Sequence, residues 1–121
     1  MSMNKIETIN YIEFPASNFD ATKTFFSEVF AWKFVDYGEN YTAFSNAGIN
    51  GGFYQSELSS KANSGAALVV FYSENLEASE VKIVKAGGVI TLPTFSFPGG
   101  RRFHFSEPSG NEFAIWSDKG L

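Results

Sequence analysis

The sequence predicts an α+β fold made of two βαβββ modules, and three observations support this. Runs of β-branched and aromatic residues at 8–14 and 66–72 open the two halves of the chain as strands. Each run is followed by a segment of helical periodicity and then by three short strand-like segments. A polar stretch at 57–65 separates the halves. We therefore expect one domain, with module one at about 6–56, a linker at 57–65 and module two at about 66–118.

The first half begins with the strand at 8–14. Ser17 and Asp20 then form a pattern similar to a capping box, which predicts the start of a helix. That helix has one largely apolar face, formed by Phe19, Thr22, Phe26, Val29 and Phe30. Three strands are expected after it, at 32–37, 41–44 and 51–55.

The second half repeats this order after the strand at 66–72. Ser73 or Asn75 is expected to cap its helix, and Gly87 with Gly88 is expected to end it. The residues in helical register are Leu76, Glu80, Ile83, Val84 and Ala86. Three further strands are expected at 89–92, 101–105 and 112–117. Few residues are identical between the halves, so the repeat is one of pattern.

Composition excludes several classes of protein. With 44% hydrophobic and 18% charged residues, the chain has the composition of a folded globular protein. It has no cysteine, which excludes disulfides, thiolate metal sites and a cysteine nucleophile. A single histidine excludes every motif that needs two. The net charge of −4 argues against nucleic-acid binding, and 14 phenylalanines in a chain of 121 residues indicate a cavity or interface lined with rings.

The segments that direct a protein to a membrane are not apparent in the sequence. The first eleven residues contain no apolar run typical of a secretory signal. The longest apolar run, at 66–72, is much shorter than the roughly 18 residues that a membrane-spanning helix needs. We therefore expect a cytoplasmic protein with no membrane partner.

Three segments together resemble one known superfamily. The segment 12–32 (IEFPASNFDATKTFFSEVFAW) is similar to the opening of a vicinal oxygen chelate domain, the superfamily of glyoxalases, bleomycin-resistance proteins and extradiol dioxygenases. The segment 73–88 (SENLEASEVKIVKAGG) is similar to its second helix, and 105–116 (FSEPSGNEFAIW) to its closing turn and last strand. The resemblance implies two modules whose curved mixed sheets surround a cleft, with the helices outside. It also implies a homodimer, formed through sheet edges or by exchange of modules.

The same resemblance places the metal ligands of this family on four strands, usually as His and Glu. The matching positions in this chain are Tyr11, Tyr54, Leu68 and Ala114. Leu68 and Ala114 have no donor atom, and a phenol is a weak ligand. We therefore predict no resident metal and no other cofactor. A rebuilt metal site of His104, Glu13 and Glu112 remains an alternative, although the family does not use those positions.

The last two strands have two different faces. If position 105 lies opposite 113, alternation puts an apolar set on one face, which should pack under a helix: Phe103, Phe105, Phe113 and Ile115. The opposite face then holds Arg102, His104, Glu112, Ala114 and Trp116. This second set has the composition of a pocket wall.

Two residues are candidates for catalysis, Glu13 and His104. Histidine ordinarily titrates near neutral pH, and Glu13 is a carboxylate within an otherwise apolar strand, so both suit acid/base chemistry. Each also has a structural interpretation, His104 as a hydrogen-bonded strand residue and Glu13 as the ion-pair partner of Arg102. Arg102 is either a clamp for a carboxylate or phosphate or an exposed solubilising residue.

The candidate ligand-binding residues are Tyr11, Tyr41, Tyr54, Leu68, Tyr72, Arg102, Ala114 and Trp116. Their rings either stack on a flat ligand or pack between modules or subunits. The segment 95–100 is either a lid over the cleft or a plain connection. The remaining rings assigned to the core are Phe14, Phe19, Phe26, Phe44, Phe71 and Phe113.

These observations predict a glyoxalase- and bleomycin-resistance-like protein without the metal site. It would bind a small aromatic or anionic organic molecule in the cleft between the modules, for example to sequester a toxic compound. The alternative is a lyase, isomerase or dioxygenase-type enzyme that uses a non-standard metal or metal-free acid/base chemistry by Glu13 and His104. A third interpretation is an interaction module whose exposed rings contact another protein. The sequence is compatible with both a binding protein and an enzyme.

Overall fold

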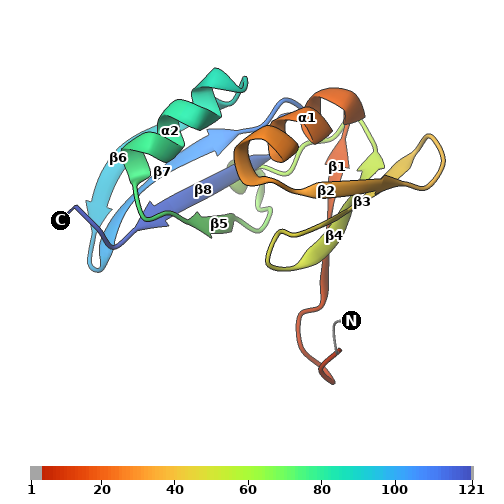
Figure 1. The fold of residues 1–121 in the computed structure, drawn as a ribbon, viewed down its shortest axis with the longest axis horizontal. Helices are drawn as coiled ribbons and strands as arrows, with labels where there is room; N and C mark the ends of the chain where they lie inside the picture. Colours follow the sequence, from red (N-terminus) through yellow and green to blue (C-terminus); the bar gives the residue numbers. More distant parts are fainter. Residues whose placement is uncertain (1–3, 121) are drawn as a thin grey trace.

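The computed structural model describes residues 4–120 and contains two four-stranded mixed sheets (Figure 1). The first sheet has the order β1-β4-β3-β2, with β1 at Tyr11–Ala16, β4 at Asn50–Gln55, β3 at Tyr41–Ser45 and β2 at Lys33–Asp36. The second has the order β5-β8-β7-β6, with β5 at Val69–Tyr72, β8 at Glu112–Ser117, β7 at Gly100–Ser106 and β6 at Val89–Phe97. In each sheet the first strand pairs parallel with the last, and the other pairs are antiparallel. The two predicted βαβββ modules are thus confirmed.

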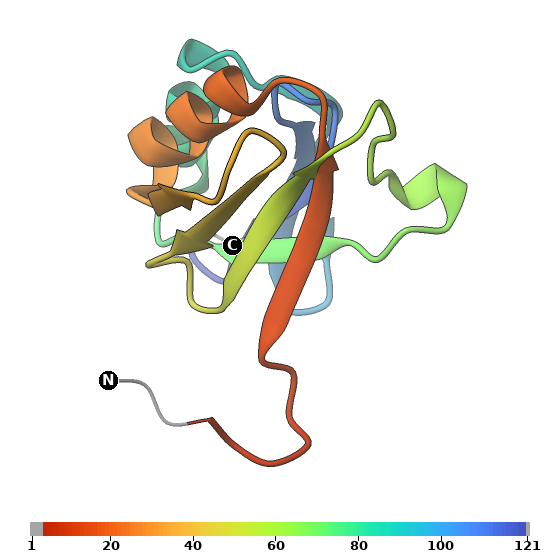
Figure 2. The same cartoon turned by 90° about the vertical axis from the view of Figure 1, so that its right-hand side faces the viewer.

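Each module carries one helix, α1 at Phe19–Phe30 and α2 at Leu76–Lys85. Both helices lie on the same side of the molecule, with the sheets beneath them (Figures 1 and 2). Asparagine caps both helices: Asn18 Oδ1 accepts from the Ala21 amide, and Asn75 Oδ1 accepts from the Ala78 amide, each at 3.1 Å. The predicted Ser17 cap was therefore wrong, and Asn75 is the cap of the second helix. Within residues 4–120, neither helix is long and apolar enough to cross a membrane.

The segment at 95–100 is not a lid. β6 continues to Phe97, and only Pro98 and Gly99 separate it from β7. Phe97 pairs with Gly100 across this hairpin, and Gly99 adopts a φ of +120°, a conformation that favours glycine. The Pro-Gly pair therefore forms a tight turn, and both phenylalanines belong to a strand.

The core lies between the inner faces of both sheets and the two helices. The predicted pairing of Phe105 with Phe113 is confirmed, and the predicted apolar face of β7 and β8 is buried. Phe113 contacts rings of both modules, with ring centroids between 5.1 and 5.8 Å from those of Phe14, Phe26, Phe71 and Phe105. Four of the predicted core rings are buried, namely Phe14, Phe26, Phe44 and Phe113. Phe19 and Phe71 are half-buried at its margin.

The turn between β7 and β8 binds module two to module one through buried polar groups. The Glu107 carboxylate, only 2% exposed, accepts from Thr22 Oγ1 of α1 at 2.7 Å. It also accepts from the Ser109 and Asn111 amides and from Asn111 Nδ2. Asn111 Nδ2 donates to the Pro15 carbonyl of β1 at 2.7 Å. Burial raises the pKa of Glu107, while its four donors favour the charged form.

Candidate functional site

The predicted site residues lie on the outer faces of the two sheets, opposite the core. Because neighbouring residues of a strand point to opposite faces, the register assigns each residue to a face. The outer face of the first sheet holds Tyr11, Glu13, Tyr41 and Tyr54. The outer face of the second holds Tyr72, Arg102, His104, Ala114 and Trp116, and Leu68 comes just before β5. Among residues 4–120, no hydrogen bond, ion pair or ring contact joins the two groups.

In the first group, Tyr41 is the central residue. Its hydroxyl donates to Glu13 Oε2 at 2.7 Å and lies 2.6 Å from the Tyr11 hydroxyl. The Tyr41 ring lies over Gly52, where any Cβ would overlap it. Glu13 therefore already has a phenol partner. The alternative ion pair of Glu13 with Arg102 is not formed, because the two residues lie on different sheets.

Tyr41 should be among the last tyrosines to ionise. Burial, together with the hydrogen bonds to Tyr11 and Glu13, raises the pKa of Tyr41 far above its ordinary value of 10.0. Because the pKa of Tyr41 is higher in the folded than in the unfolded protein, protonated Tyr41 stabilises the folded state. This contribution is complete below pH 10 and is lost as the pH rises through the raised pKa. We expect the tyrosinate absorbance of the wild type to show a tyrosine that ionises late as the pH rises. This late step should be absent in Tyr41→Phe.

Tyr37→Phe is the matched control for this titration, because Tyr37 is 65% exposed in a loop. This variant removes a tyrosine that takes no part in the hydrogen bonds of Tyr41, so the late-ionising tyrosine should remain. Glu13→Gln removes the carboxylate and should bring the ionisation of Tyr41 to lower pH. If Tyr41→Phe and Tyr37→Phe change the titration in the same way, the hydrogen-bonded arrangement is wrong.

In the second group, Arg102 lies in a row of aromatic side chains that crosses the sheet. It pairs with Phe95 on β6 and with Trp116 on β8, and Trp116 pairs with Tyr72 on β5. The Arg102 guanidinium carbon lies 5.2 Å from the ring centroid of Phe95 and 5.8 Å from that of Phe97. Within the described chain, Arg102 forms no ion pair, and its buried Nε has no hydrogen-bond partner.

His104 lies in the next row, paired with Ala114. It is 8% exposed, and its Nδ1 lies 3.6 Å from Glu112 Oε2, too far for a good hydrogen bond. Its Nε2 is buried and has no partner among residues 4–120. Buried polar atoms are nearly always hydrogen-bonded, so the unpartnered imidazole nitrogen is an unusual feature of this face.

Arg101, the neighbour of Arg102, is different. Its guanidinium makes two hydrogen bonds to the Glu77 carboxylate of α2, at 2.6 and 3.3 Å. This contact raises the pKa of Arg101 and lowers that of Glu77. The two arginines thus provide a paired and an unpaired guanidinium at adjacent positions of one strand.

Sequence reasoning missed Phe95 and Phe97 as members of this group. The available signal was their alternation with Thr94 and Ser96, which is typical of a strand. The prominence of Pro98 and Gly99 favoured a loop instead. The tight turn brings both rings back against Arg102.

The residues at the family's metal positions do not fit a divalent ion. Tyr11 and Tyr54 lie on the first sheet, whereas Leu68 and Ala114, without donor atoms, belong to the second module. Across residues 4–120 there is no group of three His, Cys, Asp or Glu side chains placed to hold a metal. The alternative site of Glu13, His104 and Glu112 is not formed within one chain.

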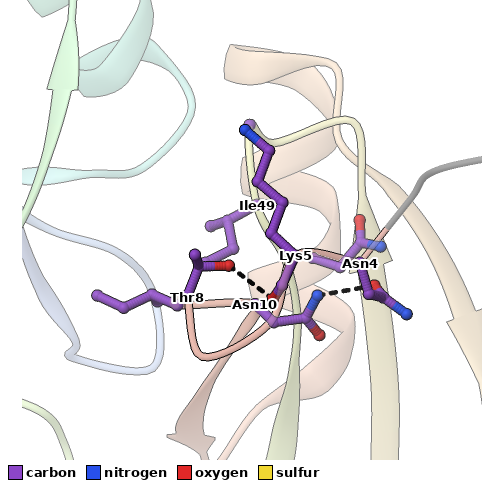
Figure 3. A pocket seen from close by; sticks show the side chains of 8 residues that line it. Asn4, Lys5, Thr8, Asn10 and Ile49 are labelled. Atoms are coloured by element: carbon purple, nitrogen blue, oxygen red, sulfur yellow. Dashed lines mark hydrogen bonds between the residues drawn. The ribbon is translucent and has the colours of Figure 1, made fainter.

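Hollows of the structure lie elsewhere, and two of them are at the N-terminal segment and between the modules. An apolar groove of about 390 Å³ between the modules is lined by Ile12, Trp32, Phe44, Val69 and Phe71, and takes only Tyr72 from the predicted site residues. A hollow of about 430 Å³ is lined by the N-terminal segment and by residues 48–50 (Figure 3). There Thr8 Oγ1 donates to the Lys5 carbonyl and Asn10 Nδ2 donates to Asn4 Oδ1, so these polar groups satisfy one another.

The structure resembles several solved proteins over almost its whole length. FosX, a fosfomycin resistance protein from Listeria monocytogenes, has a TM-score of 0.76 at 15% identity, covering 97% of this chain and 96% of that one. A glyoxalase/bleomycin resistance protein/dioxygenase family enzyme from Burkholderia phytofirmans has a TM-score of 0.73 at 13% identity, with 89% and 96% covered. A lactoylglutathione lyase from Agrobacterium tumefaciens has a TM-score of 0.68 at 16% identity, with 93% and 95% covered. No curated protein sequence matches the chain.

The order of its helices and strands makes this an α+β protein of two βαβββ modules, and the outer faces of both sheets are open. The sequence agrees with this class, because the family model of the Glyoxalase/Bleomycin resistance protein/Dioxygenase superfamily matches residues 8–115. The chain belongs to this superfamily, as the sequence motifs predicted.

Proposed function

We propose that the protein binds a small aromatic or anionic organic molecule on the outer face of its second sheet, without a resident metal. One observation carries this proposal: the Arg102 guanidinium lies beside two aromatic rings without an ion-pair partner among residues 4–120, and His104 Nε2 in the next row is buried without a hydrogen-bond partner there. Unpaired buried polar atoms are costly unless a ligand or water meets them. Membership of the superfamily supports a small-molecule ligand. So do the names of two structural relatives, a fosfomycin resistance protein and a lactoylglutathione lyase.

A homodimer is part of this proposal, as is the cytoplasmic location expected from the sequence. β1 and β5 are edge strands of their sheets, and both contribute residues to the apolar groove between the modules. Such edges offer unpaired backbone groups to another chain. Because the two groups of site residues do not meet within one chain, a second copy is needed to bring a first-sheet face opposite a second-sheet face and form the cleft.

An enzyme is the second candidate, and the Tyr11–Tyr41–Glu13 arrangement favours it. Two phenols joined to a carboxylate can pass a proton to or from a bound substrate. If a second copy places Glu13 opposite His104, the pair provides two groups for metal-free acid/base chemistry. An isomerase or lyase reaction would suit this arrangement.

Metal analysis tests the metal-free part of the proposal. Protein purified without added ions should contain far less than one equivalent of any divalent ion by mass spectrometry, and dialysis against a chelator should leave ligand binding unchanged. A stoichiometric ion whose removal abolishes binding would contradict this part.

Two substitutions separate the binder from the enzyme, once a thermal-shift screen of small carboxylates and aromatics has given a ligand. His104→Ala should weaken binding in either case, because its imidazole lies in the proposed site. Glu13→Gln should leave binding unchanged for a simple binder. Retained binding with lost turnover in Glu13→Gln would favour the enzyme, and unchanged binding in His104→Ala would exclude the proposed site.

A further inference from the structure

We infer that the ligand carries an oxyanion, a carboxylate or a phosphonate, that pairs with Arg102. This inference rests on the proposed function and specifies the class of ligand. Its basis is the contrast between the two adjacent arginines of β7. Arg101 has the Glu77 carboxylate as its counter-ion, whereas Arg102 forms no ion pair within residues 4–120. The Nε atoms of both arginines are buried without a partner there, so the contrast lies in the ion pair alone.

The environment of Arg102 favours an incoming anion over water. Its guanidinium lies against the rings of Phe95 and Phe97, and its Nε is removed from solvent. Charge–charge attraction is stronger where water is partly excluded. A guanidinium presents two parallel N–H groups to a planar oxyanion, which makes it well suited to carboxylates and phosphonates.

The nearby carboxylates are already engaged by other groups. Glu112 Oε1 accepts from the Ala62 amide at 2.9 Å, and its Oε2 faces His104 and Thr91. Asp118 Oδ1 accepts a hydrogen bond from the Tyr72 hydroxyl at 2.5 Å. Neither acid forms an ion pair with Arg102 in the described chain, which leaves its charge for a ligand.

The same row of the sheet specifies the rest of the ligand. Trp116 is the neighbour of Arg102 on β8, and its ring centroid lies 5.2 Å from that of Tyr72. A flat apolar body can contact these rings while its acidic group meets Arg102. His104 Nε2, in the next row, offers a further polar contact. The ligand class is therefore a small aromatic carboxylate or phosphonate.

Calorimetric titration of the full chain with benzoate, phenylphosphonate and benzamide tests this inference. Benzamide has nearly the shape of benzoate but lacks its charge. Benzoate and phenylphosphonate should each bind at least about tenfold more tightly than benzamide. An affinity ratio of this size corresponds to the usual free energy of a hydrogen bond to a charged group. Arg102→Gln should remove this preference, whereas Arg102→Lys should retain part of it. Comparing the two acids shows whether the site favours a carboxylate or a phosphonate.

Arg101→Gln is the matched control, since it removes the same charge from the neighbouring position and should keep the preference. Thermal unfolding of each variant shows that it is folded. Equal binding of benzoate and benzamide would overturn the inference and leave the proposed function standing. An equal loss of preference in Arg101→Gln would also overturn it, because the effect would then reflect net charge alone. Absence of binding by all three probes would contradict the inference and the proposed function together.

Discussion

Asn111→Ala should lower the free energy of unfolding by about 4 kcal/mol. The Asn111 side chain is completely buried and makes three hydrogen bonds, to the Pro15 carbonyl, the Glu107 carboxylate and the Ser60 amide. Alanine would leave these three groups, two of them buried and the Ser60 amide half-buried, without their hydrogen bonds to Asn111, and each such loss costs about 1–3 kcal/mol. Since a domain of this size has about 5–15 kcal/mol of stability in total, the variant should be only marginally folded.

Urea unfolding followed by tryptophan fluorescence measures this difference. Asn63→Ala is the matched control, because Asn63 is exposed in the segment between the modules and should change the stability by less than about 0.5 kcal/mol. If Asn111→Ala is as stable as Asn63→Ala, the polar turn does not hold the modules together.

Phe113→Ala should have a similar effect, about 4 kcal/mol, for a different reason. The ring of Phe113 is fully buried and contacts Phe14 and Phe26 of module one and Phe71 and Phe105 of module two. Its removal leaves a cavity where the two modules meet, and Phe-to-Ala changes in cores cost about 3–5 kcal/mol. The loss should affect both modules, so unfolding should remain one cooperative transition at a lower urea concentration.

The exposed aromatic Tyr37 provides the control for this substitution. Tyr37→Ala should change the free energy of unfolding by less than about 0.5 kcal/mol. Two separate transitions in Phe113→Ala, with one of them unchanged from the wild type, would show that the modules unfold independently and would contradict the shared core.

Alternation along strands allowed much of the second-sheet face to be predicted. With Phe105 opposite Phe113, the sequence alone places Arg102, His104 and Trp116 on one face, and the structure agrees. Local sequence pattern could not show that Asn18, and not Ser17, caps the first helix, because both residue types cap helices well. The tertiary contact decides it: Ser109 of module two accepts the Asn18 amide.

The relation between the two faces was beyond local sequence pattern. Tyr11 and Glu13 share a face with Tyr41, as expected, but their hydrogen bonds depend on the missing side chain of Gly52 and on a pairing of strands far apart in sequence. The cleft expected from the family depends on how modules are placed relative to one another. Periodicity does not encode that placement, so the separation of the two groups of site residues on different sheets was not predicted.

The central claim is that the outer face of the second sheet is the ligand-binding surface, and amide chemical-shift mapping tests it most directly. The labelled full chain should be titrated with phenylphosphonate while its backbone amide resonances are followed. The largest shifts should occur at Arg102, His104, Ala114 and Trp116. Shifts concentrated at Ile12, Phe44 and Val69 in the groove between the modules, with β7 and β8 unchanged, would contradict the claim.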